Sequence, residues 1–238
     1  MKQKVAVVSG ANKGIGFGVA KALAERSYKV IMLGRDKNRI NQAAEKIRAN
    51  KGDVETYIVD VSDTDQVKSF AAVFSELHAG VDVLVNNAGV ILEADFGGEP
   101  TAVESVNPED VLATLNVNTV GVLRLTQALM PLLKNADAAR IVNISSGMGG
   151  ITEMEGAWPG YRLSKAALNA LTKVTAAETQ GTNIKVNSVC PGWVRTDMGT
   201  SAANRAVDEA VPGILWAAEL GEDGPTGGFF RDGEKIEW

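Results

Sequence analysis

The chain has 238 residues, of which 45% are hydrophobic and 22% are charged, and its formal net charge is −5. This composition is typical of a globular protein, excludes a disordered chain and argues against nucleic acid as the main partner. The only cysteine is Cys190 and the only histidine is His78, which excludes an intrachain disulfide, a cysteine-based zinc site and a multi-histidine metal site. The apolar runs are too short for a membrane span or a signal peptide, so we expect a cytoplasmic protein that binds neither membrane nor metal.

Short runs rich in valine and isoleucine alternate with longer stretches rich in alanine, leucine and charged residues. The runs predict strands at residues 5–8, 30–33, 54–59, 81–85, 140–144, 184–189 and 227–230. The longer stretches predict helices at residues 14–26, 36–50, 63–79, 108–134, 161–180 and about 201–220. Asp36, Asp63 and the pair Asn107-Pro108 offer N-cap side chains or a first-turn proline at three of the helix starts.

The apolar runs are continuous rather than alternating, which is typical of strands buried on both faces of a parallel sheet. Strands that alternate with helices form βαβ units, and right-handed crossovers between them give a doubly wound sandwich. We therefore predict a single α/β domain over residues 1–238, with a parallel seven-stranded sheet and helices on both faces. Ligands of such sheets bind in the loops at the carboxyl ends of the strands.

The first predicted strand leads directly into the sequence Ser9-Gly10-Ala11-Asn12-Lys13-Gly14-Ile15-Gly16, which opens the first helix and is called the glycine turn below. Gly10 permits a tight turn, and Gly14 and Gly16 let backbone amides approach a phosphate at the positive end of the helix. Asn12, Lys13 and Ile15 complete the turn. An ordinary glycine-rich connection is the alternative, but the position after the first strand favours dinucleotide binding.

The end of the second predicted strand, Leu33-Gly34-Arg35, bears on which dinucleotide binds. NAD-binding proteins usually place a carboxylate there to accept hydrogen bonds from the ribose, whereas this chain has a glycine followed by a guanidinium. We expect Arg35, Lys13 and Arg39 to converge on a 2′-phosphate, with three solvated surface cations as the alternative. Because Lys13 lies inside the glycine turn, the sequence favours NADPH over NADH.

Tyr161 is the only one of the three tyrosines that has a lysine, Lys165, four residues later. Residues at this spacing share one face of a helix. A free phenol has a pKa of about 10 and is a poor acid at neutral pH, and we expect the ammonium of Lys165 to lower that pKa. Taken alone, the pair is better interpreted as an ordinary surface contact.

Three further motifs follow in chain order: Asn86-Asn87-Ala88-Gly89, Ile141-Val142-Asn143-Ile144-Ser145-Ser146 and Cys190-Pro191-Gly192-Trp193-Val194-Arg195-Thr196. Together with the glycine turn and the pair Tyr161–Lys165, they resemble the short-chain dehydrogenase/reductase family over nearly the whole chain. The segment from Gly224 to Gly233 is similar to that of carbonyl reductases in this family. The resemblance implies a Rossmann-type fold.

The resemblance also implies catalytic roles. Tyr161 would be the general acid that protonates a carbonyl oxygen, and Lys165 would lower its pKa and hold the nicotinamide ribose. A hydrogen bond to the substrate oxygen would come from Ser146, with Ser145 as the alternative. A proton-relay water would be supported by Asn118, with Asn116 as the alternative.

Further residues are implied to bind the cofactor, in addition to those of the glycine turn. Asp60 and Val61 would meet the adenine. The adenosine ribose would lie along Asn87, Ala88 and Gly89. The nicotinamide end would be bound by Tyr161, Lys165, Pro191, Gly192, Val194 and Thr196.

The function implied is NADPH-dependent reduction of a hydrophobic ketone or aldehyde to an alcohol. Candidate walls of the substrate pocket are residues 91–106, 148–158 and 193–203, whose large apolar side chains suit such a substrate. Acidic residues in these segments, among them Glu93, Asp95 and Glu99, would discourage anionic substrates if they face the rim.

Two alternative functions remain. A 3-oxoacyl-carrier-protein reductase shares the chemistry but needs a basic docking face, for which Arg124 and Lys173 are the only suggestive helix positions. The alternative of another class is a catalytically silent NADPH-binding sensor or scaffold. Helices 108–134 and 161–180 are free to pair across a two-fold axis, so we expect a homodimer or homotetramer.

Overall fold

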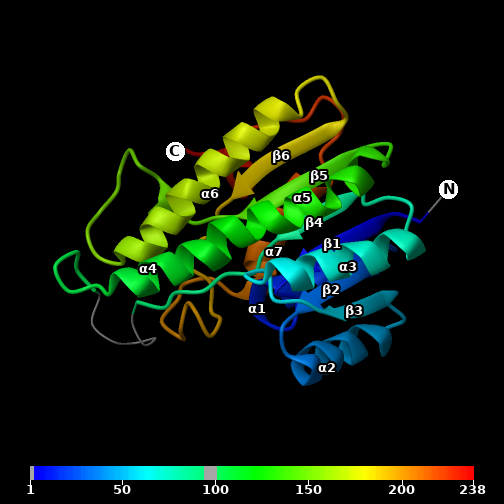
Figure 1. The fold of residues 1–238 in the computed structure, drawn as a ribbon, viewed down its shortest axis with the longest axis horizontal. Helices are drawn as coiled ribbons and strands as arrows, with labels where there is room; N and C mark the ends of the chain where they lie inside the picture. Colours follow the sequence, from blue (N-terminus) through cyan, green and yellow to red (C-terminus); the bar gives the residue numbers. More distant parts are fainter. Residues whose placement is uncertain (1–2, 94–100) are drawn as a thin grey trace.

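The structure is a computed structural model that describes residues 3–93 and 101–238. Within these residues, eight strands form one sheet in the order β3-β2-β1-β4-β5-β6-β7-β8 (Figure 1). The strands are β1 (Val5–Ser9), β2 (Lys29–Gly34), β3 (Val54–Ile58), β4 (Val83–Asn86), β5 (Ala139–Ile144), β6 (Ile184–Val189), β7 (Phe229–Arg231) and β8 (Glu234–Lys235). β1 to β7 pair in parallel, whereas β8 runs antiparallel to β7. The strand order reverses direction at β1 and β4, which is the doubly wound topology that the sequence predicts.

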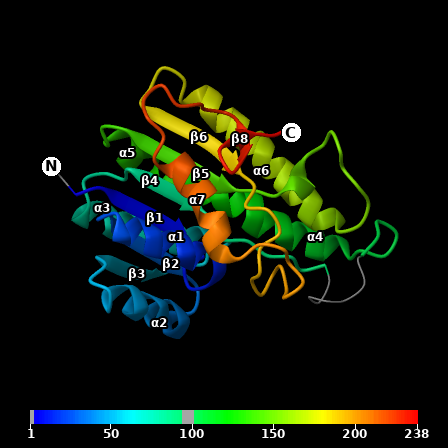
Figure 2. The same cartoon turned by 180° about the vertical axis from the view of Figure 1, so that it is seen from behind.

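Helices cover both faces of the sheet. The helices α1 (Gly14–Glu25), α2 (Lys37–Arg48) and α7 (Val207–Ala218) lie on the face seen in Figure 2. The opposite face, in front in Figure 1, carries α3 (Thr64–Leu77), α4 (Pro108–Leu115), α5 (Gly121–Lys134) and α6 (Pro159–Glu178). In the described part of the chain, no helix combines the length and the apolar character needed to cross a bilayer.

The hydrophobic core has two halves, one on each side of the sheet. Successive strand residues point to opposite faces, so Val8 of β1 packs beneath α1 and α7, while Val7 packs beneath α3 and α5. Both side chains have no exposed surface. Burial on both faces explains why the strands read as continuous apolar runs and confirms the predicted α/β sandwich.

The predicted helix starts are confirmed at three capping residues. Asp36 Oδ1 accepts hydrogen bonds from the backbone N–H groups of Asn38 (2.9 Å) and Arg39 (3.0 Å) at the start of α2. Asp63 caps α3 in the same way, and Asn107 Oδ1 caps α4. Each such cap satisfies backbone donors that the helix itself leaves unpaired, and it stabilises the fold by about 1 kcal/mol.

The sheet differs from the predicted one because the described residues contain an eighth strand. Asp232 and Gly233 have φ values of +53° and +84°, the left-handed pair that makes a tight hairpin turn. The chain therefore turns back after β7, and β8 pairs with it. A strand of two residues has no apolar run from which it could be predicted. The prediction of seven strands was therefore wrong, because it missed β8, the second strand of this hairpin.

Two helices also differ from the prediction. Residues 108–134 do not form one helix, because the π-helix η1 (Asn116–Val120) separates α4 from α5. The last helix, α7, begins at Val207 rather than near residue 201, since the Glu209 side chain accepts from the backbone N–H of Ala206 and closes the first turn there. The π-helix places one extra residue in its turn, and such turns occur frequently at functional sites.

Candidate active site

The candidate catalytic residues lie at the edge of the sheet where the parallel strands end. Gly89 follows β4 and Ser146 follows β5. The helix α6 runs beside β5 and β6 and contributes Tyr161 and Lys165 near its N-terminal end (Figure 1). Since carboxyl ends of parallel strands meet at one edge, residues far apart in sequence come together there.

Tyr161 and Lys165 are both buried, with exposed fractions of 8% and 5%. One helical turn separates them, and Lys165 Nζ lies 5.6 Å from the centroid of the Tyr161 ring. The ammonium donates a hydrogen bond of 2.7 Å to the carbonyl oxygen of Ile144, the last residue of β5. The alternative of a surface Tyr–Lys contact is therefore wrong, because the pair is enclosed between α6 and the sheet.

The protonation of this pair differs from the expectation. Burial raises the pKa of Tyr161 to about 12, and the neighbouring Ser146 side chain opposes that rise. Burial also lowers the pKa of Lys165 to about 8. The expected lowering of the pKa of Tyr161 is not found in the chain on its own, because loss of hydration is the largest effect and disfavours the charged form of both groups.

The two serines after β5 have different environments. Ser145 is buried, and its hydroxyl donates a hydrogen bond of 2.7 Å to Asn169 Oδ1 on α6. Ser146 is half-buried, interacts with Tyr161 and accepts a hydrogen bond of 3.2 Å from the backbone N–H of Met148. The geometry therefore favours Ser146 over Ser145 as the residue that can meet a substrate oxygen.

The two asparagines of the π-helix have different hydrogen-bond partners. Asn118 is fully buried, and its side chain accepts from the N–H of Val90 (2.8 Å) and donates to the carbonyl oxygen of Val90 (2.9 Å). Its amide also donates to Ser164 Oγ (3.0 Å) on α6. Asn116 instead binds the guanidinium of Arg124 at 2.8 Å. Asn118 thus connects the loop after β4 to α6, whereas Asn116 contacts α5.

The glycine turn has the backbone that phosphate binding needs. Gly10 and Gly14 have φ values of +64° and +55°. A Cβ atom on Gly16 would collide with the Gly10 carbonyl oxygen and with the Asn87 amide. The N-cap residue of α1, Lys13, makes no capping hydrogen bond with its side chain, and the first turn holds no acid. The first N–H groups of α1, Ile15 included, are thus available to an anion, which fits the pyrophosphate of a dinucleotide.

Asn87 and Ser9 hold the glycine turn against the neighbouring strand end. Asn87 Nδ2 donates to the carbonyl oxygens of Ser9 (2.9 Å) and Gly10 (3.2 Å). Ser9 Oγ accepts from the backbone N–H groups of Asn87 (3.0 Å) and Ala88 (3.1 Å). A Cβ atom on the next residue, Gly89, would lie 3.7 Å from Lys165 Nζ. The asparagine therefore positions the turn, and Gly89 lies close to both Lys165 and Asn118.

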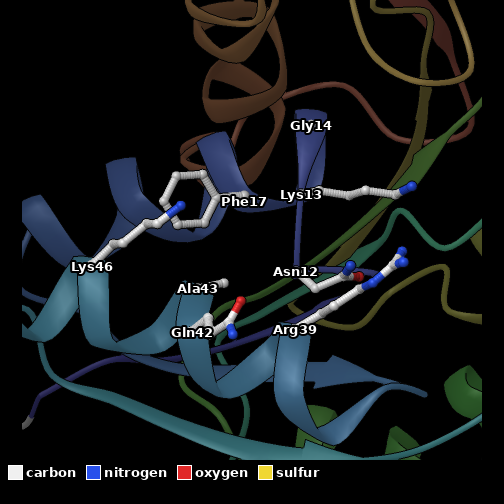
Figure 3. Close-up of a pocket in the computed structure, with 8 residues that line it drawn as sticks. All are labelled: Asn12, Lys13, Gly14, Phe17, Arg39, Gln42, Ala43 and Lys46. Atoms are coloured by element: carbon white, nitrogen blue, oxygen red, sulfur yellow. The ribbon is translucent and has the colours of Figure 1, made fainter.

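A hollow of about 420 Å³ opens between the glycine turn and α2 (Figure 3). It is lined by Asn12, Lys13, Gly14, Phe17, Arg39, Gln42, Ala43 and Lys46. Lys13 and Arg39 extend in the same direction in Figure 3, whereas Lys46 extends toward the Phe17 ring. Lys13 forms an ion pair with Asp197. Arg35 is exposed and does not line this hollow, so two of the three expected cations share it.

Lys46 and Gln42 also line this hollow, although neither was predicted from the sequence. Arg39, Gln42, Ala43 and Lys46 recur at the spacing of one helix face. That spacing was the available signal, but a solvated helix face has the same pattern.

The other expected cofactor residues lie at the same edge of the sheet but differ in exposure. Asp60 Oδ1 accepts hydrogen bonds from the backbone N–H and from the hydroxyl of Ser62, so its carboxylate stabilises a local turn. Val61 is buried, and a Cβ atom on Gly121 would touch it. After β6, Gly192 has a left-handed backbone with a φ value of +79°. The carbonyl oxygen of the preceding residue, Pro191, accepts a hydrogen bond from the Arg205 guanidinium, and the Val194 side chain is buried. Thr196 reaches the glycine turn, where a Cβ atom on Gly14 would lie 3.1 Å from its methyl group.

The expected pocket walls are only partly described. Residues 94–100, including Asp95 and Glu99, lie outside the described residues. Trp193 and Met154 are 55% and 39% exposed, which leaves apolar surface at this edge. Glu93 was expected at the rim, but its side chain is buried and accepts from two backbone N–H groups of α6. Glu93 therefore does not face the rim, because these hydrogen bonds hold its carboxylate inside.

Comparison with known proteins gives consistent matches. The family model "short chain dehydrogenase" matches residues 4–206. Salutaridine reductase from Papaver somniferum is 31% identical and covers 96% of this chain and 94% of its own length. The 3-oxoacyl-[acyl-carrier-protein] reductase FabG from Thermotoga maritima is 32% identical, with 90% of this chain and 83% of its own length covered.

Solved structures agree over the full length. The NADPH-bound carbonyl reductase from chicken fatty liver superposes with a TM-score of 0.88 at 30% identity, and all of both chains is covered. The carbonyl reductase Sniffer of D. melanogaster superposes with a TM-score of 0.88 at 29% identity, again over 100% of both chains. The fold described above is therefore that of these proteins.

Proposed function

Because the chain belongs to the short-chain dehydrogenase family, we propose that it reduces a hydrophobic ketone or aldehyde to an alcohol with NADPH. The observation that carries this proposal is the convergence of Ser146, Tyr161 and Lys165 at the carboxyl end of β5. These three side chains come from separate parts of the sequence, and each has the chemistry that carbonyl reduction needs. The related carbonyl reductases supply the reaction class.

The choice of NADPH is supported by the charges around the hollow beside the glycine turn. Lys13 and Arg39 line it, and Arg35 lies at the end of β2, where a ribose-binding carboxylate would otherwise stand. A guanidinium offers paired donors that match a phosphate. Two structural relatives were solved with NADPH bound, among them the carbonyl reductase from chicken fatty liver.

The mechanism uses the protonation states that burial creates. Bound NADPH would supply a hydride to the carbonyl carbon. Negative charge then develops on the oxygen, to which the Ser146 hydroxyl and the Tyr161 phenol donate hydrogen bonds. Burial keeps Tyr161 protonated at neutral pH, so that it holds the proton the oxygen requires. The ammonium of Lys165 stabilises the phenolate that remains after proton transfer.

A turnover assay tests this proposal directly. The purified protein is mixed with NADPH and a panel of aromatic and aliphatic ketones and aldehydes, and the absorbance of NADPH is followed. We expect it to fall with at least one apolar carbonyl compound. If NADPH binds but no panel member is reduced, the chain is instead the catalytically silent NADPH-binding sensor or scaffold.

A carrier-protein substrate is less consistent with the structure. Arg124 donates to Thr64 and Asn116, and Lys173 lies 4.8 Å from the centroid of the Trp238 ring. Both cations therefore interact with other residues of the chain and do not form an exposed basic surface for a carrier protein. A small carbonyl substrate needs no such face.

We also propose that the protein works in the cytoplasm as a homodimer or homotetramer. Large apolar side chains are exposed on α4, η1, α5 and α6, namely Leu112, Val120, Leu123, Leu163 and Val174. These helices share one face of the sheet (Figure 1). Pairing across a two-fold axis would cover them.

A further inference from the structure

The helix that carries Tyr161 begins without a capping side chain of its own. Its N-cap residue, Trp158, has a left-handed backbone with a φ value of +55°, and its side chain makes no capping hydrogen bond. An indole has no acceptor atom, and the next residue, Pro159, has no N–H group. In the first turn, the N–H groups of Gly160 and Tyr161 therefore need a partner from elsewhere.

Glu93 supplies that partner from the loop after β4. Its Oε2 accepts a hydrogen bond of 2.7 Å from the Gly160 N–H, and its Oε1 accepts one of 2.6 Å from the Tyr161 N–H. Each oxygen of the carboxylate thus serves one donor, and the side chain is only 4% exposed. A negative charge at the N-terminus of a helix is also favoured by the aligned backbone dipoles.

Two neighbouring features hold this arrangement in place. Thr101 donates from its hydroxyl to the carbonyl oxygen of Glu93 (2.9 Å) and accepts at its own carbonyl oxygen from the Trp158 N–H (3.0 Å). A Cβ atom on Gly160 would lie only 3.2 Å from Glu93 Oε2, so the glycine makes room for the carboxylate. The start of α6 is therefore bound closely to the segment that follows the Asn87-Ala88-Gly89 motif.

We propose that Glu93 is a positioning residue for the general acid. Its carboxylate fixes the backbone of Tyr161 and, through Cα and Cβ, the phenol relative to Ser146 and Lys165. This inference rests on the proposed function and adds to it a residue outside the four expected catalytic positions. A misplacement of about 1 Å in a reacting group can cost as much as 10²-fold in rate.

The isosteric variant Glu93→Gln tests the proposal. Glutamine keeps one acceptor oxygen but turns an NH₂ group toward the other backbone N–H, so one donor loses its partner. We expect kcat to fall by about 10- to 100-fold while KM for NADPH stays within about twofold. Glu93→Asp keeps both oxygens and should recover part of kcat. Glu178→Gln, the same substitution at the exposed far end of α6, is the control and should match the wild-type protein.

Amide hydrogen exchange separates positioning from general stability. We expect the Gly160 and Tyr161 amides to be protected in the wild-type protein and to exchange at least tenfold faster in Glu93→Gln, with the sheet amides unchanged. Wild-type kcat in Glu93→Gln would overturn the proposal. So would unprotected Gly160 and Tyr161 amides in the wild-type protein, a result that does not depend on how the variant folds. Should the wild-type protein reduce no carbonyl compound, the proposed function fails, and the exchange data still decide whether Glu93 holds Tyr161.

Discussion

Burial shifts the pKa values of the two central side chains, Tyr161 and Lys165, in opposite directions. It favours the neutral phenol of Tyr161 and the neutral amine of Lys165, which places their pKa values at about 12 and about 8. At neutral pH the phenol is protonated, and the lysine still carries its charge. This is the combination that an acid needs if it is to give up a proton beside a stabilising cation.

A pH profile of carbonyl reduction tests these protonation states. Lys165 is charged below a pH of about 8 and loses its proton above it, whereas Tyr161 stays protonated throughout this range. Since kcat/KM reports the free enzyme, we expect it to be level near neutral pH and to fall about tenfold per unit above pH 8. Lys165→Met, which has nothing to titrate, should be slow and should lack this falling limb. A falling limb that persists in Lys165→Met would contradict the assignment.

Some properties of the individual site residues could be predicted from the sequence, and others could not. The spacing of Tyr161 and Lys165 and the motif around Ser146 were visible, and the structure brings these side chains together. The pKa direction of Tyr161 was not visible, because it depends on how completely α6 and the sheet exclude water. Glu93 was missed as a capping residue because its partners lie 67 and 68 positions away in the chain.

At the scale of elements, the glycine turn is packed more tightly than its sequence pattern requires. Asn87 reaches across from the end of β4 to two carbonyl oxygens of the turn, and Gly16 lies against both the amide and the turn. The open N-terminus of α1 can therefore be kept in place without a cap of its own. The turn and the end of β4 thus form one packed unit, to which we assign the proposed cofactor site.

Substituting Gly16 tests this unit. In Gly16→Ala the added methyl group would collide with the Gly10 carbonyl oxygen, and the turn would have to open. We expect NADPH affinity to fall by at least tenfold, about 1.4 kcal/mol or more, as measured by calorimetric titration. Gly221→Ala is the control, since no described atom lies within 4 Å of its added Cβ. Equal NADPH affinity in both variants would show that the close packing at Gly16 has no bearing on the cofactor.

Elements were predicted well where apolar periodicity and caps agree. The first six strands, and the starts of α2, α3 and α4, follow from valine-rich runs and from Asp36, Asp63 and Asn107. The π-helix at Asn118 was not predicted, because its sequence Asn116-Val117-Asn118-Thr119-Val120 contains no proline or glycine that would end a helix. Its extra residue shows in the backbone hydrogen bond from the Gly121 N–H to the carbonyl oxygen of Asn116, five residues earlier.

For the whole molecule, the proposed preference for NADPH rests on charges contributed by separate segments. Lys13 comes from the glycine turn, Arg35 from the end of β2 and Arg39 from α2. The ion pair between Lys13 and Asp197 further links the glycine turn to the loop after β6. The doubly wound topology brings these segments to one edge. The three cations were predicted from the sequence, but not that Arg35 lies outside the hollow that Lys13 and Arg39 line.

Removing these cations should change the preference between the two nicotinamide cofactors. In Arg35→Ala and Arg39→Ala we expect KM for NADPH to rise at least tenfold, because a charge-assisted pair with the 2′-phosphate is lost, and KM for NADH to change little. Steady-state kinetics with both cofactors measure this directly. The control Lys134→Ala removes an exposed charge at the far end of α5. Similar increases for NADPH and NADH would contradict a 2′-phosphate site at these residues.

The central claim is that the Tyr161 phenol gives its proton to the substrate oxygen. Tyr161→Phe keeps the ring and removes only the hydroxyl, so the most direct test measures its turnover together with its NADPH affinity. We predict that kcat falls by about 10²- to 10⁴-fold while the dissociation constant for NADPH stays within about threefold. A variant that reduces the same carbonyl compound at the wild-type rate would contradict the account.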